Sequence, residues 1–264
     1  MSSKEKEMPF SYLLVGNWKM NPMSREEVDK YGKDFIEQTR SFDQVSCEVW
    51  ISPPALYVQL FCDLSLEGVR VGAQDVSSEK NGSRTGDLSA QMMRKEGAVF
   101  SLVGHSERRM YHGEDNDVIH QKIRRILEEG MRVILCVGEH KEDREQGNVR
   151  EKIRQQLLCL EGIEKEEGKN IILAYEPVWA VGSDRTPQTA DIREVRDMIQ
   201  EILQKLWDKD IAKKIKILYG GSVHEKNTWE TCIASGMDGA LVGRSSLNAK
   251  EFLAIARVFE KEKE

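Results

Sequence analysis

The chain has 264 residues, of which 39% are hydrophobic and 32% are charged, and its formal net charge is -6. These values are typical of a globular protein with a charged surface, and they argue against binding of nucleic acid or anionic membranes through bulk charge. No apolar run in the sequence approaches the roughly 20 residues that a membrane-spanning helix requires.

The N-terminal residues and the cysteines predict the setting of the protein. Residues 1–9 are polar and charged, without the apolar segment of a signal peptide, and we expect a flexible tail before one domain over residues 10–264. The five cysteines are scattered, with no Cys-x-x-Cys pair and no Cys/His cluster. We therefore expect reduced thiols in a cytoplasmic protein and no structural zinc or other bound metal.

Strand-like and helix-like segments alternate along the chain. Short apolar runs predict strands at 12–16, 46–51, 69–73, 99–103, 132–137, 171–175, 215–219 and 239–242. Amphipathic segments after them predict helices at 24–40, 54–64, 88–96, 115–130, 149–160, 187–208, 224–235 and 248–260. Eight such units in about 250 residues predict the α/β class and a single (β/α)8 barrel of eight parallel strands ringed by helices. An open doubly wound sheet is the alternative, but no glycine-rich dinucleotide turn follows the first strand.

Two helix starts carry capping signals. Ser24, followed three residues later by Glu27, predicts a capping box at the start of the first helix. Thr186 before Pro187 predicts an N-cap and a first helical residue for the helix at 187–208. The charged stretch 161–169 is interpreted as a solvated connector at the end of a helix.

Polar residues follow several of the predicted strands. Five strands end in valine followed by glycine, which lets the backbone leave a crowded barrel rim: Gly16, Gly72, Gly104, Gly138 and Gly243. All strands of a parallel barrel end on one face, where barrel enzymes keep their active sites. We therefore expect the polar residues after these strands to converge there: Asn17, Lys19, Gln74, Asp75, His105, Glu107 and Glu139.

One carboxylate stands at the end of a buried strand. The run 171–175 is apolar, Glu176 follows it, and Pro177 prevents the strand from continuing its hydrogen-bond ladder. Aromatic and aliphatic neighbours would leave Glu176 poorly solvated, which makes a carboxylate a better base. An ion pair with a nearby Lys or Arg is the simpler interpretation of this residue taken alone.

Five segments together resemble the signature segments of the triosephosphate isomerase family, in the family's order and over essentially the whole chain. They are Asn17-Trp18-Lys19-Met20-Asn21, Val103-Gly104-His105-Ser106-Glu107-Arg108-Arg109, Tyr175-Glu176-Pro177-Val178-Trp179-Ala180, Tyr219-Gly220-Gly221-Ser222 and Asp238-Gly239-Ala240-Leu241-Val242-Gly243. The resemblance implies a homodimeric (β/α)8 enzyme that interconverts dihydroxyacetone phosphate and glyceraldehyde 3-phosphate without a cofactor.

The resemblance also implies roles for the residues at the strand ends. Glu176 would be the base for a carbon-bound proton, and His105, heading a short helix, would be the neutral electrophile that hydrogen-bonds the carbonyl oxygen. Lys19 would supply a fixed positive charge, and Asn17 would bind the substrate or orient Lys19. Glu107 would hold Lys19 or shuttle protons, and a purely structural ion pair is the alternative for it.

The phosphate group would be held mainly by the backbone. The resemblance places it on the N–H groups of Gly182, Ser222, Gly243 and Arg244, together with the hydroxyl of Ser222. Residues 177–187 should form a lid that closes over the substrate and excludes water.

Two departures from the family pattern concern the substrate. Asp184 places a carboxylate near the tip of the lid, where it is harmless in solvent but would weaken phosphate binding if it pointed inward. Arg244 stands where the family usually has a second glycine. Its side chain either lies in solvent, which we favour, or reaches the phosphate or an additional substrate hydroxyl.

A third departure concerns the expected dimer interface. The loop that usually reads aromatic-Thr-Gly-Glu reads Arg-Thr-Gly-Asp at 84–87. By resemblance, Thr85 should dock beside the partner subunit's Asn17, and Asp87 should pair with a basic residue such as Arg109. The lost aromatic ring and the shorter acid predict a weaker dimer.

Two further functions are compatible with the sequence. A related isomerase acting on a four-carbon ketose phosphate would make use of Asp184 and Arg244. A non-catalytic phosphometabolite-binding protein should lack the base or the electrophile, whereas Glu176, His105 and Lys19 are all present. The leading prediction is a cofactor-free isomerase with a small phosphorylated sugar as substrate, and with neither nucleic acid nor membrane as partner.

Overall fold

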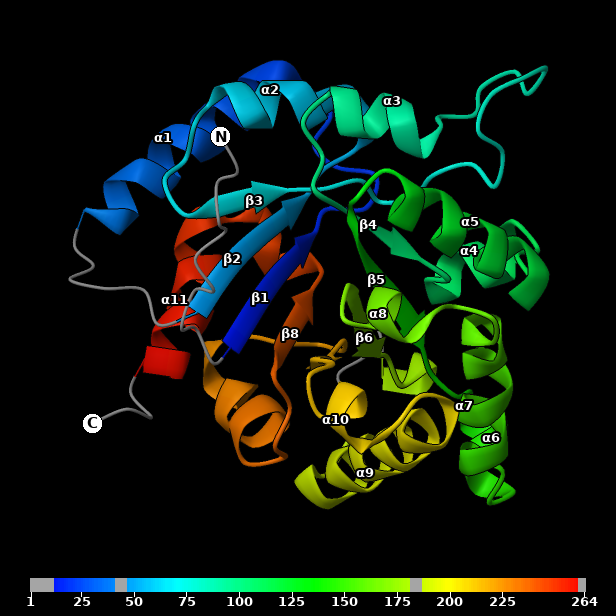
Figure 1. The fold of residues 1–264 in the computed structure, drawn as a ribbon. Helices are drawn as coiled ribbons and strands as arrows, with labels where there is room; N and C mark the ends of the chain where they lie inside the picture. Colours follow the sequence, from blue (N-terminus) through cyan, green and yellow to red (C-terminus); the bar gives the residue numbers. More distant parts are fainter. Residues whose placement is uncertain (1–11, 41–46, 181–186, 261–264) are drawn as a thin grey trace.

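The computed structural model describes residues 12–40, 47–180 and 187–260. The predicted tail at 1–9 lies outside these residues, as do Gly182, Asp184 and most of the predicted lid. Within the described residues, eight strands form one parallel sheet with the order β3-β2-β1-β8-β7-β6-β5-β4, and helices surround it (Figure 1).

The strands follow the predicted segments closely. They are β1 (Tyr12–Asn17), β2 (Cys47–Ser52), β3 (Val69–Val71), β4 (Phe100–Val103), β5 (Arg132–Val137), β6 (Ile171–Tyr175), β7 (Ile217–Tyr219) and β8 (Gly239–Val242). Each boundary lies within about two residues of the predicted one, which is the usual uncertainty of a strand end.

The sheet closes on itself between β3 and β4. A parallel bridge pairs Ala73, just beyond β3, with Ser101 of β4. The backbone N–H of Ala73 donates to the carbonyl of Phe100, and that of Leu102 donates to the carbonyl of Ala73. Closure leaves no exposed sheet edge. The predicted (β/α)8 barrel is therefore confirmed, and the open doubly wound sheet is excluded.

Most of the predicted helices are present on the outside of the barrel. They are α1 (Arg25–Thr39), α2 (Val58–Asp63), α3 (Ala90–Lys95), α5 (Asn116–Glu128), α7 (Val149–Leu157), α9 (Thr189–Leu206) and α11 (Ala249–Glu260). The predicted helix at 224–235 is instead a 3₁₀ turn, η4 (Glu225–Asn227), followed by a π-helical turn, η5 (Trp229–Ile233).

Short helices occupy several connections. They are α4 (Ser106–Tyr111), α6 (Lys141–Glu145), α8 (Lys165–Gly168) and α10 (Lys209–Ala212). Of these, the sequence predicted the short helix after His105, which is α4. The charged stretch at 161–169 was predicted as a connector. It contains the four-residue helix α8, whose N-cap residue is Glu164.

The two predicted helix starts have different outcomes. Ser24 caps α1 as predicted, because its hydroxyl accepts from the N–H of Glu27 at 3.3 Å, but the carboxylate of Glu27 accepts from the N–H of Met23 at 3.4 Å, so only half of the predicted capping box is formed. The start of α9 was placed too early, because Gln188 is its N-cap and donates its backbone N–H to Asp191 at 3.3 Å. Pro187 is buried outside the helix, so the capping carboxylate of Asp191 rather than the proline sets the first turn.

Alternating side chains fill the barrel and cover its outside. In β5, Ile134 and Cys136 point into the barrel, whereas Leu135 belongs to the layer between strands and helices. The interior is densely packed, since a Cβ on Gly72 would lie 2.5 Å from the ring of Phe100. A filled interior leaves the ends of the strands as the place for a site.

Candidate active site

A cavity of about 540 Å³ opens at the carboxyl ends of the strands. It is lined by residues that follow β1, β4, β6, β7 and β8, which are far apart in the sequence. Most of the predicted site residues within the described part of the chain line it: Asn17, Lys19, His105, Glu176, Ser222, Gly243 and Arg244. The predicted convergence at one face of the barrel is therefore present.

Glu176 follows β6 directly and is 5% exposed. Its backbone N–H donates to the carbonyl of Val137 at 2.8 Å. Glycines make room for it, because a Cβ on Gly220 would lie 2.5 Å from Glu176 Cγ and one on Gly138 would lie 1.7 Å from its carbonyl oxygen. Among the described residues, Oε2 of this carboxylate has no hydrogen-bond partner. The packing thus fixes the backbone of Glu176 and leaves one oxygen available to accept a proton.

His105 stands at the N-cap of α4, where Gly104 turns the chain with a φ of 66°. Its Nδ1 atom accepts a hydrogen bond from the backbone N–H of Glu107 at 3.2 Å. An accepting nitrogen carries no proton, so this contact places the proton of the neutral ring on Nε2. Nε2 lies 3.3 Å from Oε1 of Glu176. The cavity therefore holds a hydrogen-bond donor directly beside a buried carboxylate.

Opposing influences act on the pKa of His105. Burial is the largest and lowers this pKa, but the charge of Glu176 and its hydrogen bond to the ring raise it, and the net pKa lies above its usual value. Lys19 lowers the pKa of His105 and Glu107 raises it, both by less. The increase depends on the contact with Glu176. A substrate oxygen that took the place of this carboxylate at Nε2 would remove the main cause of the increase and favour the neutral ring.

Lys19 is held in an unusual backbone conformation. Its φ of 51° lies in the left-handed region, which costs a non-glycine residue about 1 kcal/mol or more and is stable only where neighbours enforce it. Its N–H donates to Oδ1 of Asn17 at 3.0 Å, and its carbonyl accepts from Gln74 at 2.8 Å. Its ammonium group donates to Oε1 of Glu107 at 2.6 Å. Asn17 thus holds the backbone of Lys19, and Glu107 holds its ammonium group.

Glu139 is a fully buried carboxylate for which no specific role was predicted. Its Oε1 accepts from the hydroxyl of Tyr175 at 3.1 Å, from Nε1 of Trp179 at 2.9 Å and from Nε of Arg144 at 3.1 Å. Its backbone carbonyl accepts from the N–H of Val178. Glu139 thereby anchors the segment just after Glu176. Its place after a strand-ending valine and glycine was the signal that could have identified it.

Ser222 and Gly243 line the other end of the cavity, after β7 and β8. A Cβ on Gly243 would contact Cε of Lys19 at 3.8 Å, so this end adjoins the lysine side chain. Gly243 leads into η6 (Arg244–Leu247), and Arg244 is exposed at the rim. This part of the cavity combines the hydroxyl of Ser222, backbone N–H groups and the cationic side chains of Lys19 and Arg244, which suits an anion.

Thr85 does not line this cavity. It is exposed in the connection between β3 and α3. Asp87 accepts a hydrogen bond from Ser77 at 2.6 Å, while Arg109 donates to the carbonyl of Gly104 at 2.9 Å. Within one chain, Asp87 and Arg109 are therefore bonded to different partners.

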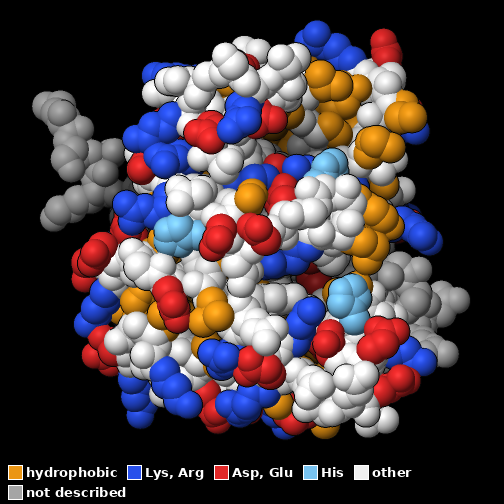
Figure 2. All heavy atoms as spheres, turned by 90° about the vertical axis from the view of Figure 1, so that its right-hand side faces the viewer, with side chains coloured by type: hydrophobic (Ala, Val, Ile, Leu, Met, Phe, Trp, Pro, Cys, Tyr) orange, Lys and Arg blue, Asp and Glu red, His pale blue; other side chains and the backbone are white. Residues whose placement is uncertain are grey.

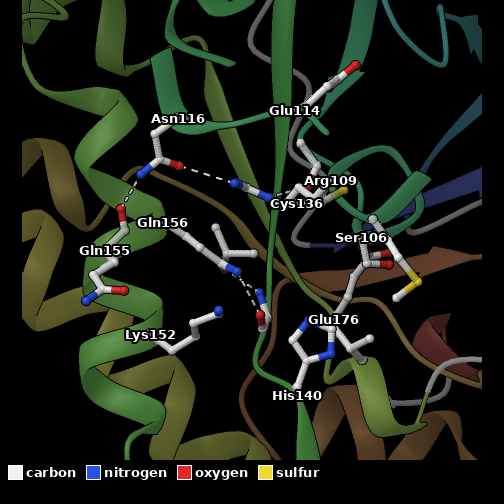
Figure 3. A pocket seen from close by; sticks show the side chains of 15 residues that line it. Ser106, Arg109, Glu114, Asn116, Cys136, His140, Lys152, Gln155, Gln156 and Glu176 are labelled. Carbon is white, nitrogen blue, oxygen red and sulfur yellow. Dashed lines mark hydrogen bonds between the residues drawn. The ribbon is translucent and has the colours of Figure 1, made fainter. Parts of the chain in front are cut away.

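A second cavity, of about 300 Å³, lies behind Glu176 (Figure 3). On its wall, Gln156 accepts from the N–H of Gly138 at 2.8 Å and donates to the carbonyl of the same residue at 2.9 Å. Cys136 also lines it, and burial together with the charge of Glu176 holds the pKa of this thiol well above its usual value. Cys136 is therefore a neutral thiol beside Glu176, and Glu176 lines both cavities.

The described part of the chain contains no group of three or more His, Cys, Asp or Glu side chains that could hold a metal ion.

Comparison with known proteins gives a consistent result. The family model described as triosephosphate isomerase matches residues 12–259. Similar curated proteins named triosephosphate isomerase include that of Alkaliphilus oremlandii, 35% identical over 246 residues that cover 92% of this chain and 97% of the relative. Those of Dictyoglomus thermophilum and Thermus thermophilus are each 38% identical, and each comparison covers 93% of this chain and 98% of the relative.

Proposed function

The chain belongs to the triosephosphate isomerase family and is an isomerase of triose phosphates, and on that premise we propose that Glu176, His105 and Lys19 are its catalytic residues. The observation that carries the assignment is the 3.3 Å contact between Oε1 of Glu176 and Nε2 of His105 in the cavity that Lys19 also lines. No cofactor is needed for the chemistry that these three groups provide.

The reaction moves a proton between two neighbouring carbons. Glu176 takes a proton from the carbon next to the carbonyl of dihydroxyacetone phosphate, while the Nε2 proton of His105 is donated to the carbonyl oxygen. The product of this step is an enediol or enediolate. Glu176 then returns its proton to the former carbonyl carbon, while the hydroxyl on the first carbon gives its proton back to Nε2 of His105, and the product is glyceraldehyde 3-phosphate.

Lys19 contributes positive charge where negative charge develops. Its ammonium group is fixed by Glu107, and its backbone is fixed by Asn17, so little reorganisation is needed when the enediolate forms. We assign Glu107 and Asn17 as positioning residues for Lys19, with the side chain of Asn17 also facing the substrate cavity.

The phosphate group is assigned to the end of the cavity formed by Ser222, Gly243 and the backbone of Arg244. Gly182, outside the described residues, completes this set in the proposal. The hydrogen bonds of Glu139 to Tyr175 and Trp179 give the lid at 177–187 a fixed starting point. A closed lid would keep water from the enediolate.

The two other functions are not favoured. The relatives over almost the whole chain are named triosephosphate isomerase, which supports the three-carbon substrate. A protein that only binds phosphometabolites has no need for a base, a proton donor and a fixed cation in one cavity.

We also propose that the enzyme is a cytoplasmic homodimer built from the single domain at 10–264. Exposed apolar side chains lie in the segments after β1, β2 and β4, including Met20 at 86%, Leu56 at 85% and Tyr111, at the end of α4, at 74% exposed. Figure 2, which views the side of α4 and α5, shows hydrophobic side chains gathered along one edge of that face. Surfaces of this kind often bind a protein partner.

The position of the loop at 84–87 supports a dimer in which this loop of each subunit fills a cavity on the other subunit. A cavity of about 590 Å³ adjoins Lys19 and is also lined by Met20 and Gln74. The exposed Thr85 of the partner would enter there and approach Asn17.

Among residues 12–40, 47–180 and 187–260, no helix combines the length and the hydropathy of a transmembrane span.

A coupled assay that follows glyceraldehyde 3-phosphate formation from dihydroxyacetone phosphate tests the proposed assignment. We expect turnover by the wild-type protein and inhibition by phosphoglycolate. Loss of turnover on substitution of Glu176, with phosphoglycolate still bound, would support its role. Wild-type protein without this activity would overturn the proposal.

A further inference from the structure

Arg244 brings a second cationic side chain to the substrate cavity. It follows Gly243, begins η6 and lines the cavity together with Ser222. Among the described residues, no hydrogen bond or ion pair holds its guanidinium group, and the residue is exposed. Its side chain is therefore free to adopt the conformation that a bound ligand requires.

The charges in the cavity indicate a role for the side chain of Arg244. The ammonium group of Lys19 is already matched by Glu107 at 2.6 Å, so once a substrate oxygen takes the place of Glu176 at Nε2 and leaves His105 neutral, the charge of Glu176 is unbalanced in the same cavity. A phosphate dianion entering a cavity with net negative charge would be repelled. The whole chain carries a net charge of -6, so its overall field does not attract the substrate either. Arg244 supplies the charge that offsets Glu176.

The chemistry of arginine suits the ligand. A guanidinium group can donate two parallel hydrogen bonds to a phosphate, and it stays charged at every relevant pH. The backbone after Gly243 brings Arg244 to the end of the cavity at which Ser222 also lies. This is the end that the proposed function assigns to the phosphate.

We propose that the side chain of Arg244, and not only its backbone, binds the phosphate dianion of the substrate. The inference rests on the proposed function, because it specifies how the phosphate of that substrate is held. In the described structure this side chain is exposed, as the sequence predicted, and the proposal concerns the complex with substrate. Since the contact is to a group that does not react, it should bind the substrate and the transition state about equally.

The test compares Arg244→Gln with Lys226→Gln. Lys226 lies in η4 and is exposed, but it does not line the cavity, so its substitution makes the same charge change nearby. The dissociation constants of phosphoglycolate and of inorganic phosphate are measured by calorimetry at two ionic strengths. KM and kcat are measured on dihydroxyacetone phosphate, and circular dichroism checks that each variant is folded.

For Arg244→Gln we expect both dissociation constants and KM to rise about tenfold, the effect of losing a hydrogen bond between charged groups. The dependence of affinity on salt should decrease, and kcat should change less than about twofold. Lys226→Gln should match the wild-type protein in all of these measurements.

Affinities of Arg244→Gln within about twofold of wild type, or equal losses in Arg244→Gln and Lys226→Gln, would overturn the inference. Calorimetry keeps this outcome separate from failure of the proposed function. A wild-type protein that binds phosphoglycolate without isomerising dihydroxyacetone phosphate would contradict the function, whatever the affinity of the Arg244 variant.

Discussion

The Nε2 atom of His105 lies 3.3 Å from Oε1 of Glu176, although the first residue follows β4 and the second follows β6. The two strands are separated by β5 in the sheet, and the curvature of the barrel turns their ends toward one cavity. A substrate carbonyl bound between these side chains would meet a proton donor and a base at once.

Shortening the base should slow the reaction without weakening binding of the phosphate. In Glu176→Asp the carboxylate withdraws by about one bond length, and a displacement of about 1 Å can cost roughly 100-fold in rate. We expect kcat to fall by about that factor or more, with the phosphoglycolate dissociation constant nearly unchanged. The control is Glu145→Asp on the exposed surface of α6, which should keep wild-type kinetics. An unchanged kcat in Glu176→Asp would remove Glu176 from its role.

Removing the charge of Glu176 should lower the pKa of His105. In Glu176→Gln the amide no longer stabilises the imidazolium, while burial and Lys19 still lower the pKa of the ring. An NMR titration of the His105 ring should therefore show a lower pKa than in the wild-type protein. Glu107→Gln should produce a smaller decrease, because Glu107 raises the pKa of His105 less than Glu176 does. The pKa of His105 staying constant in Glu176→Gln would contradict this description of the pair.

Removing the charge of Glu139 should destabilise the protein. In Glu139→Gln, Arg144 loses one of its two carboxylate partners and keeps the 3.4 Å pair with Asp191, while Tyr175 and Trp179 lose a charged acceptor, which should cost about 1–3 kcal/mol of unfolding free energy. The readout is Tm at fixed protein concentration, which should fall clearly. Glu151→Gln removes an exposed carboxylate that is also paired with an arginine, Arg154, and should leave Tm unchanged. Equal Tm values for the two variants would show that Glu139 is not an anchor.

A large side chain at Thr85 should weaken the proposed dimer. Thr85 is exposed in this chain, so Thr85→Arg has no reason to disturb the fold of the subunit itself. Sedimentation velocity should show a shift from dimer to monomer. Activity should fall together with the fraction of dimer if the Thr85 of the partner subunit contacts Asn17, which in turn orients Lys19. Lys80→Glu, on the same connection, provides a surface control. A wild-type protein that sediments as a monomer would refute the proposed homodimer.

The sequence predicted the barrel and most of the cavity because both follow from local patterns. Alternating strands and helices define the parallel barrel, and parallel strands end on one face, so His105 and Glu176 had to face the same side. The distance between them, and the direction in which each side chain points, depend on packing that the sequence does not state.

Features set by contacts between distant segments were not predicted. The role of Glu139 arises from hydrogen bonds to Tyr175 and Trp179, which belong to a strand and a turn formed much later in the chain. The left-handed backbone of Lys19 is likewise enforced by Gln74, a residue after another strand. The start of α9 was missed for a local reason instead, because Pro187 was taken as the first helical residue although Asp191, three residues after Gln188, forms the cap.

The most direct test of the central claim follows the proton itself. Dihydroxyacetone phosphate is incubated with the enzyme in D₂O, and NMR measures deuterium entering the carbon from which Glu176 is proposed to take a proton. The wild-type protein should incorporate deuterium at a rate comparable to its turnover, and Glu176→Gln should do so at least about 1,000-fold more slowly while still binding phosphoglycolate. Incorporation by Glu176→Gln at the wild-type rate would contradict the account.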